Sequence, residues 1–439
     1  SCWSMPSPRL MADKCFQSLP GFRDFTPRDC AVRNYLFSVW RDVAHRYGFS
    51  EYEAPIVEST ELYLKKTGGE LATQLFRFED QGGRDITLRP ELTASLARIV
   101  GANQRDFPKP LKWFEIGPCF RYEKPQKGRG REFIQFNADI IGESSAGADA
   151  ELIALAIDTM LTLGFKEGDF VIRASDRESW LTFCSDHNIS DPSEFLPLVD
   201  RLEKLKPEAL EEQLSSFNVT RQQVDDFVNN PENASPAFNE IRENLNARGL
   251  GQYLELDLTI VRGLAYYTGA VFEIFDTKKT MRAVAGGGRY DGLLSTLSNG
   301  AADLPATGFA MGDMVIQNFI VSTPNAQLEM EAWMARNPAC EVYLIIADED
   351  NRNEALGVIA QLRSNGISVD YSMTQLNVGK QFKKAQQSGA RFALVIGSEF
   401  PEMQLKNLSS RSEQTINHNN NLHEVIQAHL DAPDGPLIA

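Results

Sequence analysis

The most informative part of this 439-residue sequence is Phe120-Arg121-Tyr122-Glu123, followed by Gly128-Arg129-Gly130-Arg131-Glu132-Phe133-Ile134-Gln135-Phe136-Asn137-Ala138-Asp139. It predicts a strand, a basic loop and a returning strand. Arg121 and Glu123 alternate with aromatic residues, so we expect both on one face of the first strand. Gln135 and Asp139 are expected on one face of the second strand. Buried charges need partners, so such a face makes a poor core. It suits a polyanionic ligand that also carries an amine, as a nucleotide and an amino acid do together. The alternative is an exposed, charged hairpin without a ligand.

Basic residues are concentrated around this hairpin. Residues 108–133 hold seven bases against three acids, whereas the whole chain has a net charge of −16. Residues 176–248 hold fifteen acids against seven bases. The net charge argues against a nucleic-acid partner. A locally basic strip on an acidic body can nevertheless bind phosphate.

Composition and length indicate a globular protein of two or three domains, with 42% hydrophobic and 24% charged residues. No apolar run approaches the roughly 20 residues that span a bilayer, so no membrane partner is expected. The six cysteines show no Cys-x-x-Cys spacing, which favours a reducing compartment without a zinc site or disulfide framework. Residues 1–18 are expected as a disordered tail. We expect a cytoplasmic protein, or an organellar one if residues 1–12 are a targeting remnant.

Periodicity divides the chain into strand-rich and helical regions. A helix is predicted over residues 27–48, with Pro27 in its first turn and Gly48 at its end. Short strands and two further helices follow to residue 163. Residues 176–248 read as an inserted helical subdomain, and residues 322–338 as a linker. The order strand, helix, strand, helix, strand over residues 342–396 predicts a small doubly wound sheet.

Two further blocks combine glycine with polar residues. Arg262-Gly263-Leu264-Ala265-Tyr266-Tyr267-Thr268-Gly269 lies between two predicted strands, where its glycines allow close approach of a ligand and its arginine can neutralise an anion. A bulged hairpin is the structural alternative. Gly286-Gly287-Gly288-Arg289-Tyr290-Asp291 predicts either a strand that a ligand approaches or a nucleotide-binding turn, because three glycines are costly to order. It is no Walker loop, since no Gly-Lys-Ser or Gly-Lys-Thr follows.

Arg89-Pro90-Glu91-Leu92-Thr93 places a carboxylate and a hydroxyl two residues apart where a helix begins. One interpretation is helix capping, for which acids and threonines are favoured. The other is that Glu91 and Thr93 receive the ammonium group of an amino acid.

Taken together, these blocks resemble histidyl-tRNA synthetase, a class II aminoacyl-tRNA synthetase. The resemblance runs from about Leu19 to Val425. Residues 120–139 resemble the second class II motif, and residues 262–269 and 286–291 resemble the two histidine-specific signatures. These two signatures are much more discriminating than the class II motifs.

The resemblance implies an α/β protein of two domains. Residues 19–325 would form an α+β catalytic domain with a six-stranded antiparallel sheet flanked by helices and the insertion 176–248. Residues 339–432 would form an α/β anticodon-binding domain. The implied partners are tRNA(His), L-histidine, ATP as a substrate, Mg²⁺ and a second copy of the chain, which would be held through the helix Arg33–Tyr47 and the strand after it.

The resemblance also implies a role for each site residue. Arg121 and Arg262 would be the catalytic residues, both at the α-phosphate of ATP, with Arg121 also on the substrate carboxylate. The remaining ATP contacts would be Glu123 on the adenine and Arg129 on the outer phosphates. Glu91, Thr93 and Gln135 would bind the α-amino group, and Asp139, Tyr266 and Tyr267 would form the imidazole pocket, in which Asp139 and Tyr267 satisfy the two ring nitrogens.

The third class II motif departs from the family pattern. It usually ends Gly-x-Glu-Arg, with the arginine on the γ-phosphate, but Gly308-Phe309-Ala310-Met311-Gly312-Asp313-Met314-Val315 puts Val315 at that place. Ala265 stands where aspartate is common. Arg129, Arg289 and magnesium are the expected compensation, which adds Arg289 to the ATP-binding residues. A divergent branch that includes organelle-type plant enzymes has similar sequence here.

Two other functions compete with a working synthetase. One is a catalytically silent paralogue that senses histidine and regulates histidine biosynthesis. Such paralogues generally lack the anticodon domain and have degraded motif-2 arginines, whereas this chain keeps Arg121, Arg129, Arg262 and residues 340–430. The other is an RNA-binding scaffold of synthetase descent. We therefore expect an active histidine–tRNA ligase.

Overall fold

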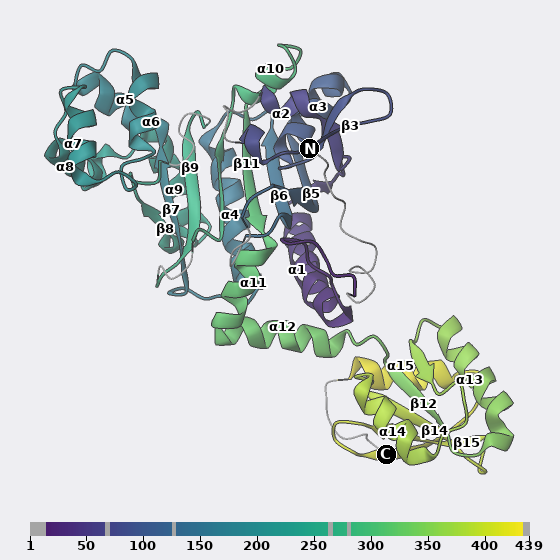
Figure 1. Cartoon of the computed structure of the whole chain (residues 1–439). Coiled ribbons are helices and arrows are strands. Elements are labelled where there is room, and N and C mark those ends of the chain that lie inside the picture. The colour runs from purple at the N-terminus through teal and green to yellow at the C-terminus, as the bar shows by residue number, and fades with distance from the viewer. Residues whose placement is uncertain (1–14, 66–70, 125–128, 262–266, 279–281, 433–439) are drawn as a thin grey trace. The chain divides into compact units, whose positions relative to one another are not determined.

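The chain folds into two compact units, up to Met330 and from Glu331 (Figure 1). The computed structural model describes residues 15–65, 71–124, 129–261, 267–278 and 282–432. Most of the expected tail 1–18 therefore lies outside the described residues. The first unit contains an eight-stranded and a three-stranded sheet, and the second contains a five-stranded sheet.

The eight-stranded sheet has the order β1-β5-β6-β11-β10-β9-β7-β8. Its strands are β1 (Ser50–Glu51), β5 (Leu111–Phe120), β6 (Glu132–Ile141), β11 (Ala306–Gly312), β10 (Ala285–Arg289), β9 (Ala270–Asp276), β7 (Phe170–Asp176) and β8 (Leu254–Leu256). All neighbours from β5 to β7 are antiparallel. β1 and β8 add short parallel pairs at the two edges. The expected six-stranded antiparallel sheet is thus present, with one parallel strand beyond each end.

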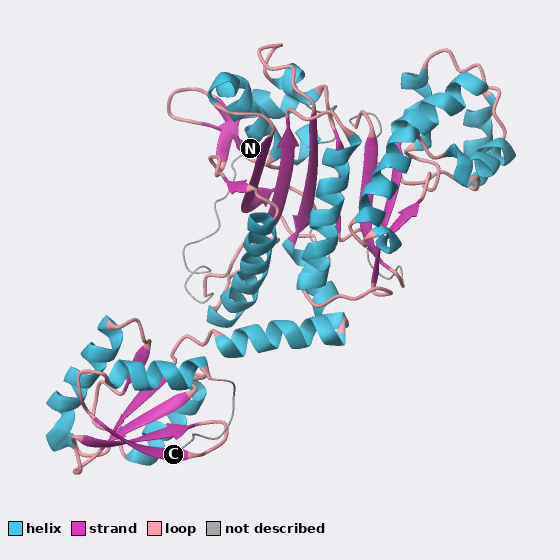
Figure 2. Ribbon diagram, turned by 180° about the vertical axis from the view of Figure 1, so that it is seen from behind, coloured by secondary structure: helices cyan, strands magenta, loops and turns pink. Residues whose placement is uncertain are grey.

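Helices cover one face of this sheet, as Figure 2 shows for α1 (Pro27–Arg46) and α4 (Ala146–Thr162). The ring of Trp40 on α1 stacks on Phe136 of β6 at 5.5 Å between centroids. Because strand residues alternate, the even-numbered residues of β6 face these helices and the odd-numbered ones face away. The helix predicted over 27–48 ends at Arg46, and Gly48 takes a φ of +74°, which suits glycine after a helix.

A smaller layer of strands and helices packs near β5, on the face of the eight-stranded sheet that is not covered by α1 and α4. It consists of β2 (Val57–Ser59), β4 (Asp85–Leu88) and β3 (Phe76–Glu79), with α2 (Thr60–Leu64), α3 (Thr93–Asn103) and α10 (Leu293–Leu297). Buried apolar residues of α3 and α10, including Leu96 and Leu294, share one cluster with Leu111 of β5. This packing fixes the start of α3 next to the large sheet.

The region 176–248 is helical, as predicted. Its helices are α5 (Arg177–Asp186), α6 (Pro192–Val199), α7 (Pro207–Ser215), α8 (Arg221–Val228) and α9 (Pro236–Ala247). Their apolar faces enclose a separate cluster around Trp180 and Phe195. Asp176 caps α5, Ser235 caps α9, and the Ser235 hydroxyl donates to Asp176 at 2.8 Å. Two helix starts are thereby joined at the end of β7.

The second unit has the sheet order β13-β12-β14-β15-β16. Its elements are β12 (Val342–Ile346), α13 (Arg352–Ser364), β13 (Val369–Tyr371), α14 (Val378–Gln387), β14 (Phe392–Ile396), β15 (Glu402–Asn407), β16 (Glu413–Asn417) and α15 (Leu422–Asp431). The three predicted strands are parallel neighbours. The predicted linker 322–338 contains the boundary between the two units, and within it Pro324–Arg336 form the helix α12 after α11 (Asp313–Ser322).

Within the described ranges, no helix combines the length and the apolar character needed to cross a membrane.

Candidate active site

Small residues form the floor of the candidate site, on the sheet face that turns away from α1 and α4. The register aligns Asp139 with Gly308 of β11, and Gly308 with Gly288 of β10. A Cβ at Gly308 would lie 2.1 Å from Asp139 Oδ1, and one at Gly288 would lie 2.7 Å from the ring of Tyr267. The glycines therefore leave the space that these side chains fill. The triple glycine is a strand and not a turn.

Polar side chains of β6 form a wall beside this floor. Gln135, Asn137 and Asp139 share the odd face, as the sequence predicted for Gln135 and Asp139. Asn137 and Asp139 are buried, and the hydroxyl of Tyr290 donates to Asp139 Oδ1 at 2.5 Å. This contact could not be predicted from local patterns, because Tyr290 follows Asp139 by 151 residues.

Gln135 faces the strand β5. Its Oε1 lies 3.9 Å from the thiol sulfur of Cys119. Burial raises the pKa of Cys119 to about 12. The thiol therefore stays protonated at neutral pH and can donate to the amide oxygen.

The prediction that Arg121 and Glu123 lie on one face of a strand is wrong, because β5 ends at Phe120. Tyr122 N donates to Gln74 O at 2.7 Å, and Glu123 N turns back to Arg121 O. The chain thus leaves the ladder one residue after the last pair. Arg121 and Glu123 lie in the connection between β5 and β6.

The basic side chains of this connection have different surroundings. Arg121 Nε donates to Pro90 O at 3.0 Å, and its guanidinium lies over the ring of Phe133. Arg129 is 39% exposed and lies 3.8 Å from Glu123. Arg131 instead donates to Glu123 O and covers the ring of Tyr122. Arg121 and Arg129 can therefore reach a ligand, whereas Arg131 supports the loop.

Glu91 caps the helix α3. Its two carboxylate oxygens accept the backbone N–H groups of Thr93 and Ala94, each at 2.9 Å. The capping interpretation of this motif is thus realised. The pKa of the Tyr52 hydroxyl is raised by burial first, and then by the negative charges of Asp139, Glu115 and Glu91. Glu91 is therefore close enough to the wall for its charge to act there.

A buried ion pair that the sequence analysis missed supports β5. Arg89 Nη1 donates to Glu115 Oε1 at 2.8 Å and to Ala54 O at 3.0 Å, while its Nε donates to Pro118 O. Both side chains are almost fully buried. Burial raises the pKa of Glu115, against the lowering effect of Arg89. The pair ties the start of α3 to the strand that precedes Arg121.

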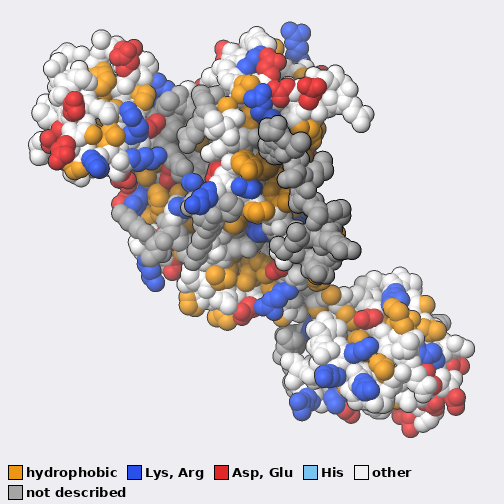
Figure 3. Space-filling model, viewed as in Figure 1, with side chains coloured by type: hydrophobic (Ala, Val, Ile, Leu, Met, Phe, Trp, Pro, Cys, Tyr) orange, Lys and Arg blue, Asp and Glu red, His pale blue; other side chains and the backbone are white. Residues whose placement is uncertain are grey.

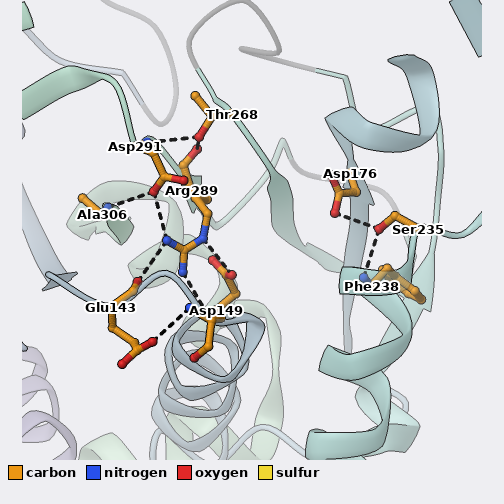
Figure 4. A network of polar contacts seen from close by, with 10 residues as sticks. Glu143, Asp149, Asp176, Ser235, Phe238, Thr268, Arg289, Asp291 and Ala306 are labelled. Carbon is orange, nitrogen blue, oxygen red and sulfur yellow. Dashed lines mark hydrogen bonds and ion pairs between the residues drawn. The ribbon is translucent and has the colours of Figure 1, made fainter. Parts of the chain in front are cut away.

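Arg289 does not belong to the ATP site. As Figure 4 shows, its guanidinium contacts the carboxylates of Asp149 and Asp291, each at 3.0 Å, and donates to the carbonyl oxygens of Glu143 and Ser145. Arg289 pairs with Thr307, and Thr307 with Ile140, so the side chain lies on the face covered by α4. Its predicted role on the phosphates is corrected to a structural one.

This network also fixes the segment that carries Tyr267. Thr268 N donates to Arg289 O at 2.8 Å, and Asp291 N donates to the Thr268 hydroxyl at 3.0 Å. Tyr267 is thereby held over Gly288. The predicted site residues Arg262 and Tyr266 lie outside the described residues.

At the third motif, Val315 is buried on α11, and its apolar side chain offers no cation for a phosphate. Asp313 is fully buried as well: its Oδ1 accepts Ile134 N at 3.0 Å, and its Oδ2 accepts Arg23 Nη2 at 2.7 Å. The start of α11 is therefore tied to β6 by a carboxylate.

The described residues contain no group of three His, Cys, Asp or Glu side chains that could hold a metal ion.

Comparisons with known proteins agree with this architecture. The histidyl-tRNA synthetase family model matches residues 21–176 and 197–314, and the anticodon binding domain model matches residues 341–429. A histidine–tRNA ligase from Opitutus terrae is 40% identical over 427 residues, covering 91% of this chain and 96% of that protein. A chloroplastic/mitochondrial histidine–tRNA ligase from Arabidopsis thaliana is 34% identical, covering 86% of this chain and 79% of that protein.

The solved structure of histidyl-tRNA synthetase from Nostoc has the same fold, with a TM-score of 0.75 at 23% identity, covering 95% of this chain and all of that one. The antiparallel sheet, the arginine-bearing connection of β5 and β6 and the separate α/β unit are those of a class II aminoacyl-tRNA synthetase. The family matches then place the chain within that class: it belongs to the histidyl-tRNA synthetase family. The resemblance found in the sequence is confirmed.

Proposed function

We propose that this chain is a histidine–tRNA ligase, which activates L-histidine with ATP to histidyl-adenylate and transfers the histidyl group to the 3′ end of tRNA(His). The relatives from Opitutus terrae and Arabidopsis thaliana are both named histidine–tRNA ligases, which supports this activity. The single observation that supports histidine as the substrate is the buried carboxylate of Asp139, held by Tyr290 above the glycine floor. A carboxylate there accepts an imidazole N–H.

The substrate would lie on the floor of β10 and β11. Asp139 and Tyr267 would bind the two ring nitrogens, and Tyr266 would complete this pocket. The α-amino group would face Glu91, Thr93 and Gln135. Specificity follows because a ligand without matching ring nitrogens leaves buried polar groups unpaired.

ATP would bind along the connection between β5 and β6. We assign Glu123 to the adenine, Arg129 to the outer phosphates, and Arg121 and Arg262 to the α-phosphate. Apart from Nε, the guanidinium of Arg121 has no contact with the described residues that would prevent a bidentate phosphate contact. Arg129 is exposed enough to move to an anion.

Catalysis would rest on position and charge. A carboxylate oxygen of histidine attacks the α-phosphorus of ATP, and pyrophosphate leaves. Fixed guanidinium groups stabilise the charge that develops on the phosphoryl oxygens, so no covalent enzyme intermediate is required. The terminal ribose hydroxyl of the tRNA then takes the histidyl group, and AMP is released.

Magnesium would enter with ATP. The phosphates would supply its main ligands, because the described residues contain no cluster of acids that could hold it alone. Its contribution would be to neutralise phosphate charge near Val315, where the usual arginine is replaced.

We propose that residues 19–325 form the catalytic domain, which includes the helical insertion 176–248, and that residues 339–432 form the anticodon-binding domain. Residues 1–18 would be a tail before the catalytic domain. The C-terminal domain would bind the anticodon of tRNA(His). On the face that Figure 3 shows, several basic side chains of this unit lie close together, and most of the acidic ones lie toward another edge. Lys380, Lys383 and Lys384 are exposed on α14 and are suited to phosphate contacts; a solvated helix face is the alternative. We expect the protein to work in the cytoplasm, or in an organelle as the Arabidopsis relative's name states for that protein.

We further propose a homodimer. Three exposed apolar residues, Ile56, Val57 and Phe78, lie on or next to the three-stranded sheet, where they are 41–47% exposed. Exposed apolar surface is typical of interfaces. The helix Arg33–Tyr47 and the strand after it would take part. Sedimentation at micromolar concentration tests this proposal, and a monomer would contradict it.

Charging of tRNA(His) with labelled histidine tests the ligase activity. Histidyl-tRNA should form with ATP and not without it. The silent regulatory paralogue predicts histidine binding without charging. That alternative fits less well, because such paralogues generally lack the anticodon domain, whereas residues 341–429 of this chain match the anticodon binding domain model.

A further inference from the structure

We infer that Asn137 is a further substrate-binding residue of the histidine pocket, whose Oδ1 accepts a hydrogen bond from the α-ammonium group of the substrate. This inference rests on the proposed function and adds a contact to it. The family resemblance assigned the ammonium to Glu91, Thr93 and Gln135.

The first observation is that Asn137 is a buried amide with an unused acceptor. The side chain is 5% exposed, and its Oδ1 has no hydrogen-bond partner among the residues that the structure describes. Its cross-strand neighbours are Glu115 on β5 and Ala310 on β11. Alanine has no polar side-chain group, so Ala310 supplies no side-chain donor to Asn137.

The second observation is that Glu115 also has a buried acceptor oxygen without a hydrogen-bond donor among the described residues. Its Oε1 accepts Ala54 N and Arg89 Nη1, whereas its Oε2 has no partner within the described part of the chain. A carboxylate oxygen and an amide oxygen are both acceptors and do not satisfy each other. Buried acceptors without a donor are costly. An ammonium group brings three N–H donors and a positive charge, which suits a place beside this carboxylate.

The position of Asn137 along β6 agrees with the size of histidine. Strand residues rise by about 3.4 Å each, so Asn137 lies about 7 Å from Asp139, whereas Gln135 lies about 14 Å from Asp139. Five bonds join the α-nitrogen of histidine to its far ring nitrogen, a span of roughly 6 Å. When the ring meets Asp139, the ammonium group reaches the level of Asn137. Gln135, with its longer side chain, must reach toward the same point.

The occupancy of Glu91 strengthens this assignment. Each of its carboxylate oxygens already accepts a backbone N–H at the start of α3. Glu91 can attract the ammonium by charge, but its best acceptor directions are partly used. Asn137 supplies an acceptor that no described residue uses.

The test compares the histidine KM in ATP–pyrophosphate exchange for the wild type and Asn137→Ala. We expect the substitution to raise this KM about 10- to 100-fold, the range for a hydrogen bond to a charged group, with little change in the KM for ATP. Asn137→Asp keeps an acceptor and should restore binding. Asn137→Ser serves if the alanine variant fails to fold.

Asn407→Ala is the matched control. Asn407 is also 5% exposed, and its Oδ1 accepts two backbone N–H groups in the C-terminal unit. This variant should lose stability without any change in the histidine KM. A rise in KM equal to that of Asn137→Ala would mean that a buried-amide defect alone causes the effect, and would overturn the inference.

A substrate without the amine separates the ammonium from the ring. Imidazolepropionate has no α-amine, and its inhibition constant should be the same for the wild type and Asn137→Ala. An inhibition constant that rises as much as the histidine KM would place Asn137 on the ring or in a purely structural role, against our inference.

Failure of the proposed function would look different. A wild type that binds histidine by calorimetry but shows no exchange would refute activation. The same comparison of variants, measured as dissociation constants for histidine and imidazolepropionate, would then still decide the role of Asn137.

Discussion

The hydroxyl of Tyr290 donates to Oδ1 of Asp139 at 2.5 Å, and both side chains are buried. Tyr290 follows directly after β10, and Asp139 lies on β6, with β11 between them. The contact is feasible because Gly308 on that middle strand has no Cβ. The hydrogen bond from Tyr290 orients the Oδ1 atom of Asp139, and it holds the carboxylate in place relative to the glycine floor.

Tyr290→Phe should weaken histidine binding. Removal of the hydroxyl takes away the hydrogen bond from Tyr290 to Asp139, and we expect the histidine KM to rise about tenfold. The KM for ATP should change little, because the assigned ATP residues lie at the connection of β5 and β6. Exchange kinetics with each substrate varied in turn measures this difference; equal effects on both constants would contradict the orienting role.

Gly308→Ala should abolish most histidine-dependent activity in a folded protein. The new Cβ would lie 2.1 Å from Asp139 Oδ1 and 2.9 Å from the ring of Tyr290. Displacement of these groups by about 1 Å is expected to cost roughly 100-fold in kcat/KM. Gly292→Ala is the control, because nothing lies within 4 Å of its Cβ and its φ is −87°. Near-normal kcat/KM for Gly308→Ala would refute the proposed pocket.

Arg289→Met should destabilise the fold. The variant leaves the buried carboxylate of Asp149 without its cation, which typically costs about 3–5 kcal/mol in the free energy of unfolding. Urea unfolding at neutral pH measures this loss. Where the variant stays folded, its KM for ATP should be close to that of the wild type. Normal stability with a raised KM for ATP would return Arg289 to the nucleotide site.

Asp176→Asn should change the pH dependence of stability. Burial raises the pKa of Asp176 in the folded protein. The folded state therefore holds the proton more tightly than the unfolded state. This contribution to stability is fully present below the unfolded pKa of about 4 and is lost as pH rises through the folded pKa.

The asparagine variant lacks that contribution. Its free energy of unfolding should therefore improve relative to the wild type between about pH 4 and pH 7. Denaturant unfolding of both proteins at several pH values measures the trend. A difference between the two proteins that stays constant with pH would show that the Asp176 carboxyl has the same pKa in both states.

Arg262→Ala should lower the exchange rate about 100- to 1000-fold if Arg262 stabilises charge on the α-phosphate. The exposed Arg105 provides a control, since Arg105→Ala removes the same charge from the surface. Circular dichroism establishes that the variants are folded. A folded Arg262→Ala variant with near-normal exchange would remove this residue from the catalytic set.

Local patterns predicted the parts of the fold that depend on nearby residues. The apolar stripe and terminal residues of α1 gave its bounds to within two positions. Alternation placed Gln135 and Asp139 on one face of β6. The order of strands and helices after residue 342 was also correct. These features depend on spacing within a single element.

Features that depend on distant partners were not predictable. The ion pair of Arg289 could not be foreseen, because its partner Asp149 lies 140 residues earlier, on a helix that covers the other face of the sheet. The end of β5 at Phe120 depends on Gln74, which takes the N–H of Tyr122. The pair Arg89–Glu115 gave no sequence signal either, since each residue alone resembles a surface charge.

The most direct test of the central claim is histidine-dependent ATP–pyrophosphate exchange by the purified chain, with the other amino acids as controls. We predict robust exchange with histidine alone, which would also show that Val315 is tolerated in the third motif. Absence of exchange at saturating histidine and ATP, with histidine binding intact by calorimetry, would contradict the ligase and favour the regulatory paralogue.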